Sequence, residues 1–127
     1  MKKLILISLT VIAALGWSSC KKAGLGGDAN IVAYPEHHGK AIYGATVYVK
    51  FDSEDAPGSG TSGYDEVFEG NSNEDFVRIN GLRKGKYYLY AVGYDPAISQ
   101  AVLGGQSASI GRQDKNEDLR VEISVTE

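Results

Sequence analysis

Cys20 is the only cysteine in this 127-residue chain, and its thiol offers the most distinctive chemistry in the sequence. A single cysteine excludes an intramolecular disulfide, even in an oxidising compartment. The residues before it fall into three parts: the positive pair Lys2 and Lys3, an apolar run over 4–16, and small residues next to Cys20. This order is typical of a secretion signal. The apolar run is shorter than the about 20 residues that a membrane-spanning helix needs.

Residues 18–20, Ser-Ser-Cys, resemble the end of the lipobox of bacterial lipoproteins. In that family the thiol receives a diacylglycerol, the signal is cleaved before the cysteine, and the new amine is acylated, commonly with palmitate. The resemblance implies that residues 1–19 are a signal peptide and that Cys20 is the lipid-bearing first residue of an envelope protein. Trp17 departs from the aliphatic residue that is usual there. The alternative is an ordinary secretory signal cleaved near 14–16, which would leave a free thiol.

Residues 20–30 are rich in glycine and small side chains and lack hydrophobic periodicity, which predicts a flexible lipidated tether. Two or three acyl chains would anchor it firmly, whereas one chain binds a membrane only marginally. We expect attachment to the outer membrane. Some double-membrane bacteria mark surface export by acidic residues directly after the lipidated cysteine, but Lys21 and Lys22 stand there in this chain. The periplasmic and surface sides therefore both stay open.

The formal net charge of the chain is −3, and loss of the two positive charges of Lys2 and Lys3 with the signal makes it −5. An acidic domain lacks the basic footprint that nucleic acids require, so we expect no nucleic-acid partner. Residues 31–127, the expected folded part, are enough for one domain and too few for two.

Two adjacent imidazoles, His37 and His38, are the first candidates for metal binding. Neighbouring side chains on a strand point to opposite faces, so we expect these two not to converge on one ion. Exposed turn histidines are the preferred interpretation. The acids of 52–55 and 71–75 do not follow the offsets of a calcium loop, which favours solvated carboxylates, although calcium binding there stays open. We therefore predict no metal site and no cofactor.

Nucleophilic catalysis needs a nucleophile beside a base and an orienting acid. No serine of the chain stands in a Gly-x-Ser-x-Gly elbow, and Ser59 lies between two glycines in a loop expected over 52–63. The pair Gly104-Gly105 is not followed by a phosphate-binding pattern. We therefore predict no catalytic residues and a protein that is not an enzyme.

The chain has eight tyrosines, which is many for so small a domain. Tyr48, Tyr88 and Tyr90 fall on two expected strands, where their rings could form a flat aromatic platform. Such a platform can stack on sugars or accept an anchor residue from a protein partner. The alternative, which we favour on general grounds, is that the rings pack across strands and stabilise the sheet. If the domain has a ligand or partner face, we place it on these tyrosines or on the loop 52–63.

Strands must position these residues, because no segment shows a sustained apolar period of about 3.6 residues. The clearest alternation covers 119–126, and a second covers 45–51. Residues 86–94 are apolar on both faces, which predicts a central strand. Weaker strands are expected at 29–34, 64–69, 76–79 and 97–102, with a further one near 107–110. Turn residues separate them, so we predict an all-β, antiparallel sandwich of about seven strands.

Residues 39–49 read Gly-Lys-Ala-Ile-Tyr-Gly-Ala-Thr-Val-Tyr-Val, and residues 77–89 read Val-Arg-Ile-Asn-Gly-Leu-Arg-Lys-Gly-Lys-Tyr-Tyr-Leu. Together they resemble the carboxypeptidase regulatory-like domain family, whose fold is a transthyretin-like, or prealbumin-like, β-sandwich related in architecture to immunoglobulin domains. The resemblance covers residues 31–125. Ala41 stands where the family often has proline, and Val77 where an aromatic residue is usual; the alternation is kept. The resemblance implies an accessory domain and no peptidase activity, because the family's catalytic domain is a separate one.

Within the second segment we expect Leu82 to insert from a turn, and Tyr87 and Leu89 to enter the core. Gly81 and Gly85 permit turn geometries that a Cβ would penalise. A buried Tyr87 hydroxyl needs a hydrogen-bond partner, for which a loop carbonyl is the candidate.

These patterns predict a non-catalytic, membrane-anchored binding or accessory interaction module with a protein or glycan partner. The lipid would hold the domain at high local concentration for that partner. Two alternatives are a carbohydrate-binding lipoprotein of a glycan uptake system, and a subunit of a surface assembly that pairs through an edge strand.

Overall fold

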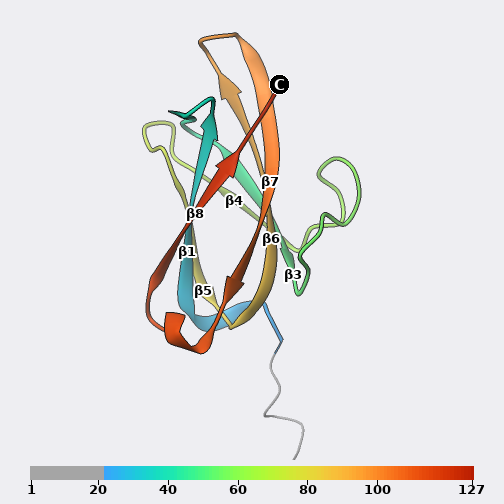
Figure 1. The fold of residues 1–127 in the computed structure, drawn as a ribbon, viewed down its shortest axis with the longest axis vertical. Helices are drawn as coiled ribbons and strands as arrows, with labels where there is room; N and C mark the ends of the chain where they lie inside the picture. Colours follow the sequence, from blue (N-terminus) through green and yellow to red (C-terminus); the bar gives the residue numbers. More distant parts are fainter. Residues whose placement is uncertain (1–21) are drawn as a thin grey trace, which may run out of the picture.

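The computed structural model of the protein describes residues 22–127, so the expected signal peptide and Cys20 lie outside the described residues. Strands and the turns between them make up nearly all of this part of the chain (Figure 1). In chain order the elements are β1 (Leu25–His37), β2 (Lys40–Ala41), β3 (Thr46–Phe51), β4 (Glu66–Glu69), β5 (Val77–Leu82), β6 (Gly85–Asp95), β7 (Gln100–Ile110), the 3-10 helix η2 (Arg112–Asp114) and β8 (Asp118–Ser124).

The strands form two sheets that share one hydrophobic core, which confirms the all-β sandwich (Figure 1). In one sheet β1 pairs antiparallel with β2 and β5. The other sheet has the order β4-β3-β6-β7 and is antiparallel throughout. One pairing departs from the expected antiparallel arrangement, because β8 lies parallel to β1 from Asn30↔Asp118 to Glu36↔Ser124. The first and last strands of the described chain are therefore neighbours in one sheet.

Alternate residues of the facing strands fill the core, as the period-two patterns predicted. Val47 and Val49 of β3, Leu89 of β6, Ile31 of β1 and Ile123 of β8 are all completely buried. Burying an aliphatic side chain of this size contributes about 1.5–3 kcal/mol relative to leaving it in water. The two sheets are therefore held together mainly by this apolar layer.

The central position predicted for 86–94 is confirmed, since β6 lies between β3 and β7. Leu82, Tyr87 and Leu89 are each 0% exposed, which confirms their predicted core positions. The Tyr87 hydroxyl accepts a hydrogen bond from the Gly24 N–H at 2.8 Å and donates to the Arg83 carbonyl. The loop carbonyl that a buried Tyr87 was expected to need is therefore that of Arg83.

One long strand, β7, stands where two short strands were expected at 97–102 and 107–110. The pair Gly104 and Gly105 at its centre interrupts the sequence pattern without interrupting the strand. A Cβ on Gly105 would collide with the Tyr88 hydroxyl, and one on Gly104 would collide with the backbone of β8. These glycines therefore allow close approach of neighbouring groups, a common use of glycine inside a strand.

The folded domain begins before the expected boundary at 31, because the structure places 25–30 in β1. Ala29, which the sequence placed both at the end of the tether and at the start of a strand, is only 3% exposed. A Cβ on Gly27 would collide with the backbone of Leu82, since β1 runs very close to β5 here. The small residues of this segment thus serve close packing, and the expected tether is corrected over its described part.

Candidate functional site

The outer face of the β4-β3-β6-β7 sheet carries a group of tyrosine rings. Tyr48 of β3 lies directly opposite Tyr90 of β6, and their ring centroids are 6.5 Å apart. Tyr64, just before β4, stacks on Tyr90 with centroids 5.8 Å apart and an angle of 14° between the rings. It also lies 5.8 Å from the ring of Tyr48. We call Tyr48, Tyr64 and Tyr90 the tyrosine cluster; all three are half-buried.

The structure brings together two of the three tyrosines expected on this face. Tyr88 lies on the same face next to the cluster: it pairs in register with Lys50 and Ser107, and its hydroxyl lies over Gly105 of β7, the residue opposite Tyr90. The third ring of the cluster is Tyr64 instead. The sequence placed Tyr64 at the start of a strand expected over 64–69, but nothing in it located that strand beside 45–51.

The hydroxyl of Tyr64 is buried and has no hydrogen-bond partner among the described residues. Burial, with smaller contributions from the neighbouring Tyr88 and Tyr90, raises the pKa of Tyr64 to about 12. A tyrosine whose hydroxyl is buried without a hydrogen bond stabilises the sheet mainly through the packing of its ring. The cluster therefore contains both features considered from the sequence: rings packed across strands, and partly exposed ring surface.

Replacing Tyr64 with Phe is expected to leave stability unchanged or to raise it by up to about 1 kcal/mol, because the variant removes a buried hydroxyl that forms no hydrogen bond. Tyr87→Phe is the matched comparison. It removes a hydroxyl bonded to Gly24 and Arg83, so it should cost about 1–2 kcal/mol. Urea unfolding measures both changes. A loss for Tyr64→Phe equal to that for Tyr87→Phe would mean that the Tyr64 hydroxyl has a partner in solution.

Two acids in and next to the loop 52–63, Glu54 and Asp65, are engaged with nearby donors. Glu54 forms an ion pair with Lys86 at 2.7 Å, which raises the pKa of Lys86. The Asp65 carboxylate accepts the Phe51 N–H at 2.7 Å and lies 3.5 Å from the Lys50 ammonium. In residues 22–127 no group of three potential metal ligands includes this loop. Its acids therefore stay separate instead of converging on a cation.

A pocket of about 320 Å³ opens at the end of the sandwich where β1 begins. Figure 1 shows this end, with the start of β1 beside the β5–β6 turn and η2. Leu82 and Ile110 are among the apolar lining residues. The charged lining residues are Arg83, Lys84, Arg112 and Lys115 with the single carboxylate of Asp28. Lys115 lies 3.8 Å from Asp28, while Lys84 and Arg112 are exposed. We call these four cations with the pocket the basic end.

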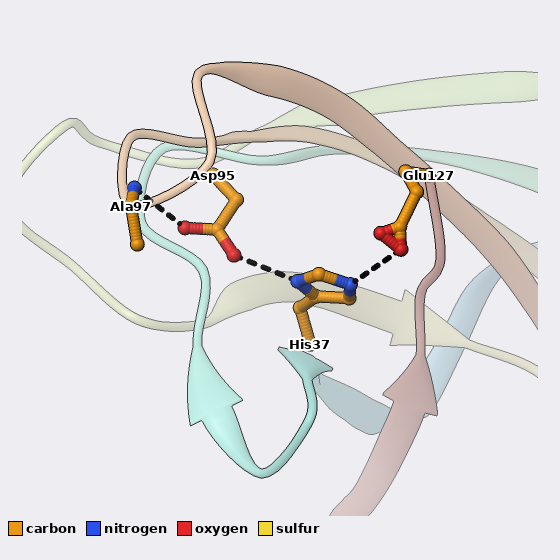
Figure 2. Close-up of polar contacts among 4 residues, drawn as sticks. All are labelled: His37, Asp95, Ala97 and Glu127. Carbon is orange, nitrogen blue, oxygen red and sulfur yellow. Dashed lines mark hydrogen bonds and ion pairs between the residues drawn. The ribbon is translucent and has the colours of Figure 1, made fainter.

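The opposite end of the sandwich contains a buried histidine between two carboxylates (Figure 2). His37, the last residue of β1, is 2% exposed. Its Nδ1 lies 2.7 Å from Asp95 Oδ2, and its Nε2 lies 3.3 Å from Glu127 Oε2. Asp95, at the end of β6, is fixed in turn by the Ala97 N–H, which donates to its other oxygen at 2.9 Å.

These contacts shift the pKa of both His37 and Asp95. The hydrogen bond to Asp95 is the main cause that raises the pKa of His37; Glu127 adds to it, and burial opposes it. The same bond, with help from the Ala97 N–H, holds the pKa of Asp95 below its ordinary value of 3.8. The pair therefore favours an imidazolium beside a carboxylate.

The expectation that His37 and His38 point apart is wrong. His38 has a φ of 52°, so the chain leaves the extended conformation at this residue and the alternation of side chains ends. The two rings lie side by side with centroids 4.2 Å apart. His37 is also not an exposed turn residue, although His38 is exposed.

The His37–Asp95 pair predicts a stability maximum at mildly acidic pH for the metal-free protein. Because the folded pKa of His37 is raised, its contribution is complete below the ordinary 6.5 and is lost as pH rises through the folded value. Because that of Asp95 is lowered, its contribution is complete above 3.8 and is lost as pH falls through the folded value. Glu127, His38 and Lys40 are the other charged or titratable groups at this position.

Thermal unfolding with a chelator present measures this effect. The difference in melting temperature between the wild type and Asp95→Asn should be largest between about pH 4 and 6.5 and shrink toward pH 9. Asp55→Asn, which changes an exposed carboxylate, is the control. Its melting-temperature difference from the wild type should not peak in this pH range. A difference that stays constant across this range would contradict the raised pKa of His37.

No family model, no curated protein and no solved structure matches the chain. Within residues 22–127, no helix has the length and apolar character to cross a membrane.

Proposed function

We propose that the protein is a non-catalytic binding or accessory module of the cell envelope, anchored to the outer membrane by lipid on Cys20. The order of residues around Cys20 supports the lipid anchor. The observation that carries the proposal is the positive charge at the end of the domain nearest to Cys20. The similarity of 39–49 and 77–89 to the carboxypeptidase regulatory-like domain family agrees with an accessory role.

The residue proposed to carry the lipid stands only two positions before the start of the described chain. The Arg83 guanidinium donates to the carbonyls of Lys22 and Leu25 at 2.7 and 2.6 Å, which fixes the start of the described chain to the β5–β6 turn. Cys20 precedes Lys22 by two residues, so their Cα atoms are separated by at most about 7 Å. A lipid on Cys20 would therefore hold the basic end directly against the headgroups.

The charge of this end supports such an orientation. The mature chain carries a net charge of −5, yet four cations and one carboxylate line the pocket beside the anchor. Each Lys or Arg close to an anionic membrane surface contributes about 1 kcal/mol to attraction. The basic end thus complements the lipid, and the acidic remainder of the domain would face away from the membrane.

The partner face in this proposal is the tyrosine cluster. Half-exposed tyrosines are frequent anchors at protein interfaces, and they give contact area at low cost in side-chain entropy. The cluster lies on the sheet face, away from the core, so a partner could approach it while the basic end faces lipid. Tyr90→Ala is the variant that tests the tyrosine cluster as a partner face, because Tyr90 contacts both other rings.

A carbohydrate partner is the second candidate, because partly exposed tyrosine rings on a sheet face also suit sugar binding. Titration of glycans against the detergent-solubilised protein, followed by tyrosine fluorescence, tests this candidate. Quenching by one glycan class that disappears in Tyr90→Ala would favour it over a protein partner. Flat titrations across glycan classes would remove it.

Assembly through an edge strand is the third candidate, and the edges differ in how well they suit it. β4 is a short edge with the carboxylates of Glu66 and Glu69, which discourage pairing with another strand. On the other edge Leu103 of β7 already bridges to Thr126. A defined higher-mass species purified from membranes would be required to support this candidate.

A further inference from the structure

We propose that His37, His38 and Glu127 form a binding site for a divalent transition-metal ion such as Zn²⁺. The three side chains lie at the end of the sandwich opposite the basic end, so the inference is independent of the proposed function. Two imidazole nitrogens and one carboxylate oxygen are a ligand set suited to Zn²⁺, with a fourth position left for water or another ligand.

The spacing of the ligand atoms supports this proposal. One ligand atom from each of the three residues lies within 4.8 Å of the others. His37 Nε2 and Glu127 Oε2 are 3.3 Å apart, which is long for a charge-assisted hydrogen bond. The same separation is what two ligands have on a tetrahedral ion with bonds of about 2.0 Å. Two of the three ligand atoms are therefore already at coordination distance from one another.

Asp95 prepares His37 for this role. Its carboxylate accepts from Nδ1 at 2.7 Å (Figure 2), so when the ring loses a proton to bind an ion, the proton on Nδ1 stays and Nε2 becomes the free ligand atom. Metal-binding histidines almost always donate their second ring N–H to a carboxylate or carbonyl in this way. The Ala97 N–H holds Asp95 in place at 2.9 Å, so the orientation of the imidazole is fixed before an ion arrives.

His38 supplies the third ligand and the entry path. Its left-handed φ of 52° places its ring 4.2 Å from that of His37, measured between centroids. His37 is buried at 2%, whereas the side chain of Glu127 is 42% exposed and His38 is exposed. An ion can therefore reach Nε2 of His37 from solvent, and the two exposed ligands can close on it by rotating their side chains.

The charges at the site balance a divalent cation. Glu127 as a ligand and Asp95 behind His37 contribute two carboxylates, and both imidazoles bind as neutral groups. A bound ion would join the end of β1 to the segment after β8, and through Asp95 to the end of β6. It would also replace the Nε2 proton of the imidazolium, while the Nδ1 proton stays in the hydrogen bond to Asp95.

The experiment uses the protein as the cell produces it, purified from whichever cell fraction contains it and freed of metal. Calorimetric titration with ZnCl₂ should show one equivalent bound, and the melting temperature should rise on binding and return to its initial value with a chelator. Co²⁺ should give the visible absorption of a four-coordinate site. Ca²⁺ and Mg²⁺, which prefer sites built from oxygen alone, should bind at least 10-fold more weakly.

His38→Ala and Glu127→Gln are the decisive variants, because both residues are exposed and neither change should disturb the core. Each should weaken Zn²⁺ binding by at least about 10-fold, and Asp95→Asn by about 10- to 100-fold. Glu122→Gln, an exposed carboxylate on β8, is the matched control and should bind as the wild type does. Absence of Zn²⁺ binding by the wild type, or unchanged binding by His38→Ala and Glu127→Gln, would overturn the proposal.

Discussion

Replacing Gly27 with alanine is expected to lower the free energy of unfolding by about 3 kcal/mol, the upper end of the usual cost of overpacking. The added Cβ would collide with the backbone carbonyl and Cα atoms of Leu82 and Arg83, which lie on the paired strand β5 and at its end. Backbone atoms cannot rotate away, so β1 would have to separate from β5 locally. This loss is a large part of the total stability of an ordinary domain, about 5–15 kcal/mol.

Gly58→Ala is the matched control for this change. Gly58 lies in the loop 52–63, and a Cβ there would meet nothing within 4 Å. The control should be neutral, or more stable by about 0.4–1 kcal/mol because alanine restricts the unfolded chain. Urea unfolding of both variants gives the comparison. If Gly27→Ala behaves like Gly58→Ala, the segment before residue 31 is a flexible tether in solution and not part of β1.

Replacing Cys20 with serine is expected to move the protein from the membrane fraction to the soluble fraction. The variant cannot receive a diacylglycerol, and each buried methylene of an acyl chain contributes about 0.8 kcal/mol to membrane binding. The basic end alone gives only salt-sensitive attraction. Fractionation of cells followed by a high-salt wash of the membranes measures the change.

Ser19→Ala serves as the control, because alanine keeps a small residue directly before the cysteine. This variant should stay in the membrane fraction after the salt wash, as the wild type should. A Cys20→Ser protein that remains bound after the wash would show that something other than lipid on Cys20 holds it.

The fold was largely predictable from the sequence because sheets with one buried face produce regular alternation. Residues 119–126 and 45–51 showed it clearly, and the two apolar faces of 86–94 identified β6 as central. Glycine caused two of the errors. Around Gly27 it suggested a tether, and at Gly105 it suggested a strand end, although at both positions it allows a close approach that depends on a strand distant in the sequence.

The ends of the sandwich were less predictable, because loops bring their residues together. The alternation rule applies to His37 but fails at His38, where the backbone turns left-handed. Asp95 and Glu127 reach His37 from the end of β6 and from the segment after β8, and no local spacing links these three positions. The parallel pairing of β1 with β8 likewise joins two strands that are far apart in the sequence.

The most direct test of lipid anchoring is the mass of the N-terminal peptide of the protein purified from membranes. Lipid anchoring predicts a peptide that begins at Cys20 and carries a diacylglyceryl group on sulfur, with an additional acyl chain on the amine. A peptide that begins near 14–16 with an unmodified Cys20 thiol would contradict it and would establish an ordinary secreted domain instead.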